Sequence, residues 1–524
     1  MVEQVVRRIA ERIFAEAPDG WSGAVALCRV AGRGGSLSGG YQGLGEGKRG
    51  HHRAGLFSEF ETLAQAIQGG AVRVPLTMEV VCDPSGHYAL VAAAGPISGV
   101  PPFRGGGFEV VLDPGHRFVP SGFRQEAGTA PPAGDPELAA RRLRDYLARR
   151  SAILGRPEQL SPAASPAAIE EAEHRLGLPL PADLKAMYLV ADGEDPRGPD
   201  RSLFANACWL SLESLVRQHL EQTVPGCADP DADWDEVFLH ADPPHTVRRC
   251  AAHPGWVTFA MANDGDALAV DLAPARDGRP GQVIKYGPDL PDHPIYVADS
   301  VTSLLGGYLD RLEQGAYTHD TRRPGGLDLW ADVYEDEAPS TVTGAIPNPV
   351  LPGLQEVHVN DPAGLVDLAP LTAATHLLRL RVNSGTTADL TPIGELPVED
   401  LRLTVDGADL TPLAGHPALA SLDLGSIGQV DLTPLSTIPN LHGLDLSRAD
   451  ARDLTVLAGL PGLRYLALTR RQWAHLRETG STPATLAVAR LAGEDATLTD
   501  VLAWAAGLGL DLAPVSELTG NLRT

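Results

Sequence analysis

The stretch DLTPLSTIPNLHGLDL, from Asp431 to Leu446, decides the architecture of the last third of the chain. Its opening phrase, Asp-Leu followed by Thr-Pro-Leu or a close variant, recurs with an L-x-x-L-x-L segment behind it. The copies begin at Asp367, Asp389, Asp409, Asp431 and Asp453, which are 22, 20, 22 and 22 residues apart. A fixed period of this length with this core is typical of a leucine-rich repeat solenoid, in which each unit adds one short strand to a stack. The sequence therefore predicts an α/β leucine-rich repeat solenoid over residues 325–470.

The residues between the leucines predict one face of that solenoid. Side chains alternate along a strand, so when the leucines point inward the residues between them face the concave surface, in columns. One predicted column is Arg379, Asp400, Ser421, Gly443 and Tyr465. The next is Arg381, Arg402, Asp423, Asp445 and Ala467. We expect a basic patch of the three arginines beside an acidic patch of Asp423 and Asp445, which would fit a charged protein partner. Ordinary solvated strand residues are the alternative.

The repeats depart from the usual pattern in one respect. The asparagine normally found two places beyond the last leucine is absent, and Ile427 and Ala449 stand in its place. Because an aspartate side chain can accept hydrogen bonds from backbone N–H groups two residues on, we expect Asp431 and its equivalents to cap the turn instead.

Composition limits the classes of function. The chain has 524 residues and a net charge of −25, which argues against a nucleic-acid binder because such a protein needs a basic footprint. No apolar run approaches the roughly 18 residues that span a bilayer. The five cysteines are scattered, as expected in a reducing cytoplasm. Of 42 basic residues only Lys48, Lys185 and Lys285 are lysines, a bias that suggests a bacterial, GC-rich source.

The chain is too long for one core, and its composition shifts predict the boundaries. Residues 1–119 are expected to form a small α+β domain, with an amphipathic helix followed by a hairpin. Residues 120–136, rich in Pro, Gly and Ala, are predicted to be a linker that is open to proteolysis. A second α+β domain is expected over 137–317. Residues 471–524 are predicted to be a helical C-terminal cap, because a terminal repeat otherwise exposes its core.

The second domain carries several separated motifs of a known family. They are IEEAEHRLGLPLPADLKAMY from Ile169, WVTFA from Trp256, GDALAVDLAP from Gly265, GQVI from Gly281 and VADSVTSLLGGYLDRLEQG from Val297. This region resembles the SUKH superfamily, also called SMI/KNR-like. The resemblance implies an α+β fold used for protein binding. Many bacterial members act as immunity proteins that neutralise toxins, and eukaryotic members resemble scaffolds for signalling and cell-wall synthesis. The family pattern has no catalytic residue.

The N-terminal domain has a resemblance of its own. Trp21, the predicted hairpin and its turn at Asp83–Gly86 resemble small immunity-type domains that precede SUKH domains in actinobacteria. The resemblance implies an actinobacterial source.

Motifs for catalysis and for cofactor or metal binding fail the test of context. Gly45–Gly50 matches G-x-G-x-x-G, but dinucleotide binding requires a strand before it and a helix N-terminus after it, and the sequence has Gly39-Gly40 before it and His51-His52-Arg53 after it. Cys250 and His253 have metal-like spacing without a second pair. No nucleophile elbow occurs. The sequence therefore predicts no enzyme activity, no cofactor and no metal.

An acidic segment surrounds one tryptophan. Asp231, Asp233 and Asp235 alternate with other residues around Trp234, but glycine and an acid are missing from the positions an EF-hand loop needs. We expect a solvated acidic loop with Trp234 exposed. Contact with a partner is the alternative, since tryptophan often anchors interfaces.

These observations predict a cytoplasmic protein-binding module, an immunity or immunity-derived protein that neutralises a protein toxin. The alternative is an intracellular scaffold or regulator of cell-wall or signalling processes, acting through both the SUKH domain and the repeats. Nucleic acid, membranes and small-molecule substrates are not expected as partners.

Overall fold

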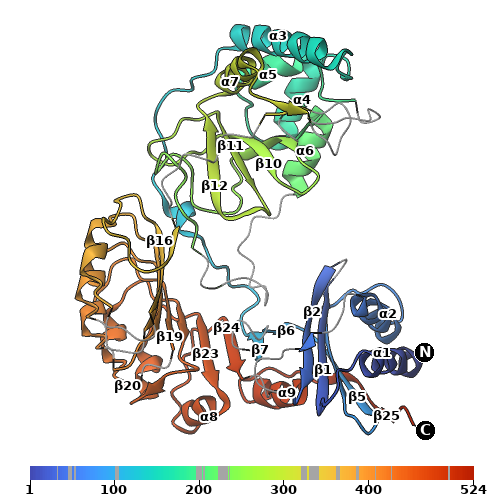
Figure 1. Ribbon diagram of the computed structural model, residues 1–524, viewed down its shortest axis with the longest axis vertical. Coiled ribbons are helices and arrows are strands. Elements are labelled where there is room, and N and C mark those ends of the chain that lie inside the picture. Colours follow the sequence, from blue (N-terminus) through green and yellow to red (C-terminus); the bar gives the residue numbers. More distant parts are fainter. Residues whose placement is uncertain are drawn as a thin grey trace. The chain divides into compact units, whose positions relative to one another are not determined.

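The computed structural model describes most of the chain as two compact units (Figure 1). Unit 1 comprises Met1–Phe118, Cys227–Asp235 and Thr341–Thr524, and unit 2 comprises Val119–Gly226 and Glu236–Ser340. The structure describes all residues except 32–33, 45–49, 52–54, 101–105, 196–202, 205–206, 222–233, 235–236, 320–326, 330–340, 362–365, 385–388, 408, 426–427, 494–495 and 524.

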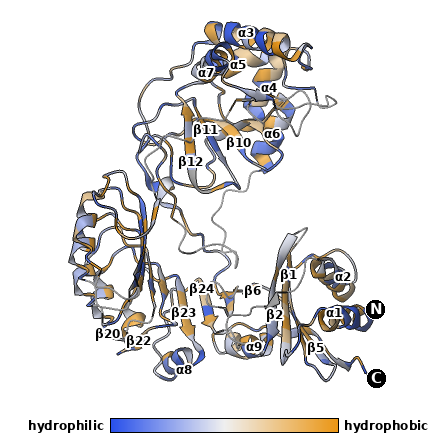
Figure 2. Ribbon diagram, viewed as in Figure 1, coloured by the Kyte–Doolittle hydropathy of each residue, from blue (hydrophilic) through white to orange (hydrophobic). Residues whose placement is uncertain are grey.

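A stack of parallel strands, here called the solenoid, forms the larger part of unit 1. The leucine pattern predicts those between Arg379 and Thr469, and all of these strands pair in chain order. They are β15 (Thr341–Gly344), β16 (Glu356–Asp361), β17 (Arg379–Ser384), β18 (Asp400–Thr404), β19 (Ser421–Leu424), β21 (Gly443–Asp445), β23 (Tyr465–Thr469) and β24 (Val488–Ala492). The inward leucines, such as Leu401, Leu422 and Leu444, are fully buried. Figure 2 shows hydrophobic residues along these strands, as a continuous core between repeats requires.

Each return from strand to strand contains a short 3-10 helix with an aspartate cap. These helices are η3 (Ala369–Ala373), η4 (Thr391–Glu395), η5 (Thr411–Leu413), η6 (Thr433–Thr437) and η7 (Leu454–Gly459). Beside them β20 (Gln429–Val430) pairs with β22 (Asp450–Ala451). The Oδ1 atom of Asp431 accepts the backbone N–H of Thr433 at 2.9 Å, and the other four phrase-opening aspartates make the same bond at 2.8 or 2.9 Å. The predicted capping role is confirmed.

The C-terminal region contains strands as well as helices, so the predicted helical cap at 471–524 is wrong. Its elements are α8 (Arg470–Glu478), β24, α9 (Leu498–Ala506) and β25 (Pro514–Asn521). β24 adds a further rung to the solenoid, and its free edge is covered by β7 (Phe108–Val111) and then β6 (Ile97–Gly99), both antiparallel. An uncovered strand edge exposes unpaired backbone groups. Strands from the N-terminal part of the chain satisfy that edge.

The N-terminal part of unit 1 is a six-stranded antiparallel sheet with two helices. Its order is β25-β5-β4-β1-β2-β3, with α1 and α2 packed on one core through residues such as Ile9 and Phe60. The elements are α1 (Val2–Ala15), β1 (Gly23–Ala31), β2 (Gly34–Gln42), β3 (Gly50–His51), α2 (Leu56–Gln68), β4 (Leu76–Cys82) and β5 (His87–Ala94). The Gly-rich segment around Gly39 belongs to strand β2. At Gly39, with φ of +110°, a Cβ would lie 2.1 Å from the carbonyl oxygen of Val25, so only glycine fits.

This sheet is not the separate domain predicted for residues 1–119. β25, from the end of the chain, forms its edge beside β5, while β7 leaves it for the solenoid. The reason is that both partner strands lie near the opposite end of the chain, beyond the reach of local sequence patterns. Sheet and solenoid therefore form one unit.

Unit 2 is an α+β domain built on a five-stranded antiparallel sheet, in the order β12-β11-β10-β9-β8. Its strands are β8 (Cys208–Trp209), β9 (Trp256–Met261), β10 (Ala267–Asp271), β11 (Gln282–Gly287) and β12 (Leu290–Ala298), with a small pair of β13 (Thr318–His319) and β14 (Leu327–Asp328). Its helices are α3 (Pro136–Leu154), α4 (Pro166–Leu176), α5 (Ala182–Tyr188), α6 (Leu212–Glu221) and α7 (Val301–Gln314). Both helix and strand residues, including Tyr188, Trp209 and Phe259, enter one buried core.

The segment predicted as a linker, residues 120–136, packs onto unit 2. It includes the 3-10 helix η2 (Ser121–Arg124). The Gly122 N–H donates to the Arg249 carbonyl at 3.1 Å, and the Arg248 guanidinium donates to the carbonyl oxygens of Gly122 and Gln125 at 2.9 and 2.7 Å. Glycine serves close backbone approach here, because a Cβ at Gly122 would lie 2.3 Å from the Arg249 carbonyl oxygen. The segment is therefore bonded to unit 2 and is not the free linker predicted, while preferred proteolysis there stays a prediction.

Candidate protein-binding face

The outward residues of the solenoid strands form the two columns that the sequence predicts. In-register pairing aligns the Cα atoms of each column from strand to strand. The first column is Glu356, Arg379, Asp400, Ser421, Gly443 and Tyr465. The second is His358, Arg381, Arg402, Asp423, Asp445, Ala467 and Arg490. Neighbouring strands lie about 4.8 Å apart, so side chains of adjacent rungs interact directly.

The first column is a chain of ion pairs. The Arg379 guanidinium lies between two carboxylates, with Nη1 3.0 Å from Glu356 Oε1 and Nε 3.5 Å from Asp400 Oδ2. Asp400 Oδ1 also accepts a hydrogen bond from the Ser421 hydroxyl at 2.5 Å. Burial alone raises the pKa of Glu356, but Arg379 and then His358 outweigh it, and the net pKa of Glu356 is lowered. Arg379 is thus neutralised within the fold and is not part of a free basic patch.

The second column pairs the charges predicted as two opposed patches. Arg402 Nε lies 2.6 Å from Asp423 Oδ2, and Arg448, beyond the end of β21, donates to both oxygens of Asp423 at 2.8 and 3.0 Å. Asp423 is 4% exposed, so its two arginines offset the cost of burying the charge. The separate basic and acidic patches are therefore wrong, because opposite charges on neighbouring rungs meet one another. Reversing Arg402 would break an ion pair.

Arg381 is the exception in this column. Its side chain is half-buried between the His358 and Arg402 rungs, and its Nε is buried without a hydrogen-bond partner in the part of the chain that the structure describes. A buried N–H without a partner costs about 1–3 kcal/mol. Among the arginines predicted to bind, Arg379 and Arg402 make ion pairs, whereas Arg381 makes none within the described residues.

The last rungs form a buried cluster that joins the solenoid to β7. The Tyr465 hydroxyl donates to Glu109 Oε1 at 2.6 Å, and Arg490 Nη1 lies 3.5 Å from Asp445 Oδ2. Asp445 also accepts from the Ser447 N–H and hydroxyl at 2.9 and 2.6 Å. Burial, with the nearby charge of Asp423, raises the pKa of Asp445, and burial raises the pKa of Tyr465. Asp445 is only 5% exposed and does not form an open acidic patch.

Trp234 covers this end of the face. Its indole stacks on the Tyr465 ring with centroids 4.0 Å apart and an interplanar angle of 13°. His442 Nε2 lies 3.2 Å from the Trp234 carbonyl oxygen. Trp234 is therefore half-buried against the solenoid and is not the exposed residue predicted. Asp231, Asp233 and Asp235, predicted beside it, lie outside the described residues.

The sequence analysis missed the residues at both ends of the columns. Glu356 and His358 stand in β16, whose inward residues Val357 and Val359 follow the leucine pattern, so the same register would have found them. Arg490 follows the pattern Leu486, Ala489 and Leu491, but the Asp-Leu phrase that marks other repeats is replaced there by α8. Glu109 has no such signal, because its strand is antiparallel and distant in sequence.

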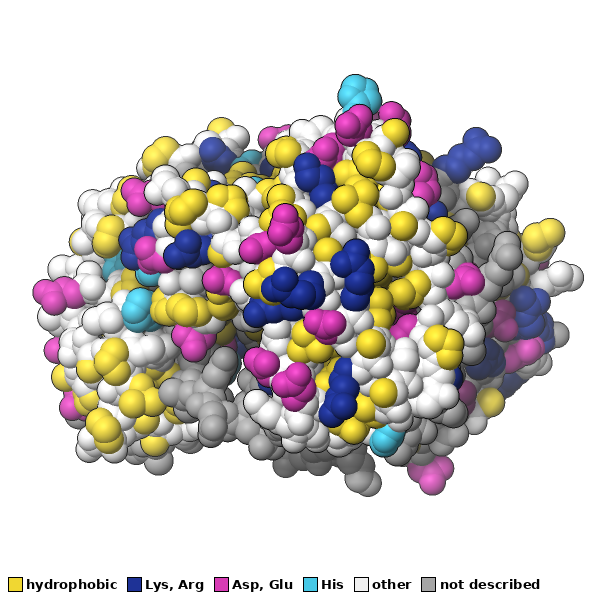
Figure 3. All heavy atoms as spheres, turned by 90° about the horizontal axis from the view of Figure 1, so that it is seen from above, with side chains coloured by type: hydrophobic (Ala, Val, Ile, Leu, Met, Phe, Trp, Pro, Cys, Tyr) yellow, Lys and Arg dark blue, Asp and Glu magenta, His cyan; other side chains and the backbone are white. Residues whose placement is uncertain are grey.

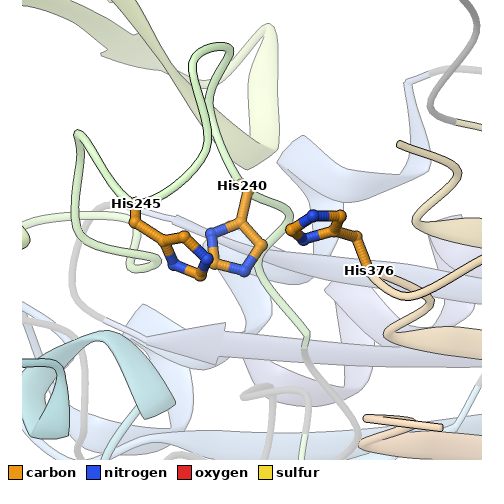
Figure 4. A group of neighbouring side chains, drawn as sticks. All are labelled: His240, His245 and His376. Carbon is orange, nitrogen blue, oxygen red and sulfur yellow. The ribbon is translucent and has the colours of Figure 1, made fainter. Parts of the chain in front are cut away.

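Histidines and acids of the described residues gather in two places, and the expected absence of a metal stays a prediction. Figure 4 shows His240 and His245, whose ring centroids are 4.3 Å apart at 72°, and His376, which belongs to unit 1. Two histidines supply half of the four ligands of a structural zinc site. His253, considered with Cys250, uses its Nδ1 to accept the Gly255 N–H at 3.0 Å.

The carboxylates of Asp264, Asp266 and Asp289 lie close together near the turn after β9. Those of Asp264 and Asp266 already have partners within the fold. Asp264 Oδ1 accepts the Asp266 N–H at 3.1 Å, and Asp266 Oδ2 lies 2.8 Å from Lys285 Nζ. Their local role is to hold the turn between β9 and β10 and its contact with β11.

Two further acids stabilise the core of unit 2. Glu194 accepts the N–H groups of Trp209 and Leu203 at 2.6 and 3.3 Å, and burial raises its pKa to about 7. Asp271 accepts from Ala273 and Gln282, and burial raises its pKa to about 7. Both carboxylates make structural hydrogen bonds. On the face seen in Figure 3, acidic and basic side chains are interspersed, so no field of one sign marks a partner among the described residues there.

Residues 163–307, most of which belong to unit 2, match the SMI1 / KNR4 family (SUKH-1). The cell wall biosynthesis/cell cycle regulator smi1 of Schizosaccharomyces pombe is 28% identical over 172 residues, which are 31% of this chain and 33% of that protein. The glucan synthesis regulatory protein of Neurospora crassa is 26% identical over 192 residues, 31% of this chain and 36% of that protein. The chain thus spans about a third of the length of these curated relatives. Both are fungal, and a bacterial or actinobacterial source stays a prediction.

Among solved structures, an internalin (InlF) from Listeria monocytogenes aligns with 25% of this chain and 41% of its own, at 23% identity and a TM-score of 0.21. In the described residues, no helix combines the length and the apolar character needed to cross a membrane.

Proposed function

We propose that this chain is a non-catalytic regulator or scaffold that binds proteins through its SMI1/KNR4 domain and through the concave face of a leucine-rich repeat solenoid. The relatives are named as regulators of cell-wall biosynthesis and glucan synthesis, which supports this alternative over a toxin-immunity function. Because the matched region is about a third of each relative, regulation of cell-wall synthesis is part of the proposal. We place the protein in the cytoplasm.

The solenoid part of this proposal rests on one observation, the buried Nε of Arg381 that has no hydrogen-bond partner among the described residues. The neighbouring charges of the face are used by ion pairs, as at Arg379 and Arg402, whereas the Arg381 Nε is buried without a partner among the described residues. A carboxylate of a bound protein would supply that partner in a partly desolvated setting, where charged hydrogen bonds are worth about 1.5–3 kcal/mol. Solenoids commonly present such extended concave surfaces to their partners.

The paired columns make this face suitable for specific recognition. Buried ion pairs hold the Arg379 and Asp423 side chains in one arrangement, so the surface is ordered before a partner arrives. A preorganised surface loses less side-chain entropy on binding than a mobile one. A partner would then read shape and the available cation at Arg381, and not a broad electrostatic field.

The test is affinity capture with the full chain as bait in an extract of the source organism. We expect Arg381→Glu to reduce recovery of the specific partner about tenfold, equal to about 1.4 kcal/mol. The variant should fold, because Arg381 makes no ion pair in the described chain and a glutamate there would face His358 and Arg402.

Arg471→Glu is the matched control, since Arg471 is exposed on α8 outside both columns. It applies the same charge reversal and should leave recovery unchanged. Equal recovery with Arg381→Glu and with Arg471→Glu would contradict the solenoid part of the proposal. Capture of a nuclease or deaminase in place of a cell-wall or signalling protein would favour the immunity function instead.

A further inference from the structure

A slot for an aromatic side chain interrupts the first column at its far end. Its floor is Gly443 and one wall is the Tyr465 ring, on which the Trp234 indole stacks. Val111, Ala467 and Val488 are buried beside it in a small apolar cluster that is distinct from the main solenoid core.

Gly443 is required for space and not for backbone conformation. A Cβ built on Gly443 would lie 2.1 Å from Cε3 and 2.4 Å from Cζ3 of Trp234, and its φ is not in the left-handed region. Every other residue of this column from Glu356 to Tyr465 has a side chain. The missing side chain at this one rung leaves room for an indole.

The occupant comes from a different part of the chain. Cys227–Asp235 lies in sequence between two stretches of unit 2, yet it groups with unit 1. Trp234 is the described residue of this segment. Its indole stacks on Tyr465 and lies against Gly443, and its carbonyl oxygen lies within hydrogen-bond distance of His442 Nε2. It remains half-buried, unlike the core tryptophans Trp209 and Trp256.

We infer that this slot is a binding site for a tryptophan-bearing acidic segment of a partner protein, and that Trp234 occupies it in cis. Trp234 indicates what a partner segment should offer. Its indole stacks on Tyr465, its main-chain carbonyl faces His442 Nε2, and its sequence neighbours on both sides are rich in aspartate. The inference extends the proposed function, because it names the class of partner that the concave face binds. The inference rests on the proposed function in one respect, namely that the concave face binds a partner protein.

Because Trp234 belongs to the same chain, the slot is open to a partner only when Trp234 leaves it. A segment of the same chain competes with a free peptide at a high effective concentration. A partner segment must therefore displace Trp234, and its apparent affinity falls in proportion to the fraction of molecules in which the slot is free. Removing the Trp234 side chain should raise binding of an added segment by tenfold or more.

The probe is a fluorescein-labelled peptide with the sequence of residues 228–237, ADPDADWDEV, titrated into the full-length protein and followed by anisotropy. We expect the Trp234→Ala protein to bind it at least tenfold more tightly than the wild type. The same peptide with alanine in place of tryptophan is the control and should bind neither protein.

Gly443 then shows whether the peptide uses the slot. Trp234→Ala combined with Gly443→Val should bind the peptide at least tenfold more weakly than Trp234→Ala alone, because valine fills the space. If that variant does not fold, Gly443→Ala replaces it, since a Cβ alone meets the indole.

Two results would overturn the inference: no binding to Trp234→Ala at millimolar peptide, or equal binding with and without the change at Gly443. Failure of the peptide together with a preserved effect of Arg381→Glu on partner capture would overturn this inference and leave the proposed function standing. Loss of both effects would overturn both.

Discussion

Early and late rungs of the solenoid share one register but stabilise their outward side chains differently. Near β17 the Arg379 guanidinium lies between Glu356 and Asp400, so the column is neutralised by its own neighbours in the repeat. Near β23 the column offers Gly443 and Tyr465, and the indole that covers them comes from a segment far earlier in the chain. The same strand register therefore gives paired charges around Arg379, here called the ionic end. At Gly443 and Tyr465, here called the acceptor end, it gives a surface that receives an indole.

The largest effect is expected from breaking the ionic end. Arg379→Ala leaves Glu356 and Asp400, which are 6% and 3% exposed, without their cation. Removing one partner of a buried pair costs about 3–5 kcal/mol. We expect the unfolding free energy of unit 1 to fall by that amount in urea denaturation. A loss below about 1 kcal/mol, the value usual for solvated pairs, would mean that the two ends do not differ as described.

Adding a side chain at the acceptor end should have an intermediate effect that depends on Trp234. Gly443→Ala forces the indole away in the wild type, at a cost of about 1–3 kcal/mol for overpacking. In the Trp234→Ala background the same change should cost almost nothing, because the space is empty. Equal costs in the two backgrounds, measured in a double-mutant cycle, would show that the indole does not occupy the slot in solution.

The two ends should also respond to pH with opposite signs. The folded-state pKa of Glu356 is lowered, so its stabilising contribution is present above its unfolded pKa and is lost as pH falls through the folded value. Glu356→Gln should therefore destabilise at pH 7, by about 1.5–3 kcal/mol for the loss of a charged hydrogen bond. The destabilisation should become smaller as the pH falls through the lowered folded-state pKa of Glu356, because the carboxylate of the wild type is then protonated.

The folded-state pKa of Asp445 is raised, so ionising Asp445 weakens the fold as pH rises above its unfolded value. Asp445→Asn should therefore gain stability relative to the wild type as the pH rises above about 4. Thermal melts across the range from acid to neutral pH check both variants. Parallel pH profiles for the two variants would contradict the assignment of opposite shifts.

The smallest effect is expected at the exposed part of the ladder. The Arg402 side chain is 40% exposed, and Asp423 keeps Arg448 when Arg402 is removed. We expect Arg402→Ala to cost less than about 1 kcal/mol, as for most solvent-accessible ion pairs. A cost as large as that of Arg379→Ala would show that exposure does not separate the two pairs.

Sequence periodicity predicted the solenoid and both columns, because a repeat of nearly constant length brings equivalent positions together by local rules. It did not predict the state of the charges, since Arg402 and Asp423 become partners only when adjacent rungs are considered as a pair. Family motifs predicted the fold of unit 2. Residues 120–136 were predicted to be a linker because they are rich in Pro, Gly and Ala. Composition did not reveal their packing, because glycine also allows close backbone approach, as at Gly122.

Long-range pairings were beyond that reasoning. β25, at the end of the chain, pairs with β5, and β7, from the N-terminal part, covers the edge of β24. The same holds for Trp234, whose acidic surroundings predicted exposure, while the glycine that receives it lies in a repeat much later in the chain. A glycine in a column of larger residues was the available signal for that slot.

The most direct measurement of the central claim is quantitative affinity capture with wild type, Trp234→Ala and Arg381→Glu side by side. If the concave face binds a partner and Trp234 competes for it, recovery of the same partner should rise about tenfold with Trp234→Ala and fall about tenfold with Arg381→Glu. Equal recovery by all three proteins, each shown to be folded by its melting curve, would contradict the claim.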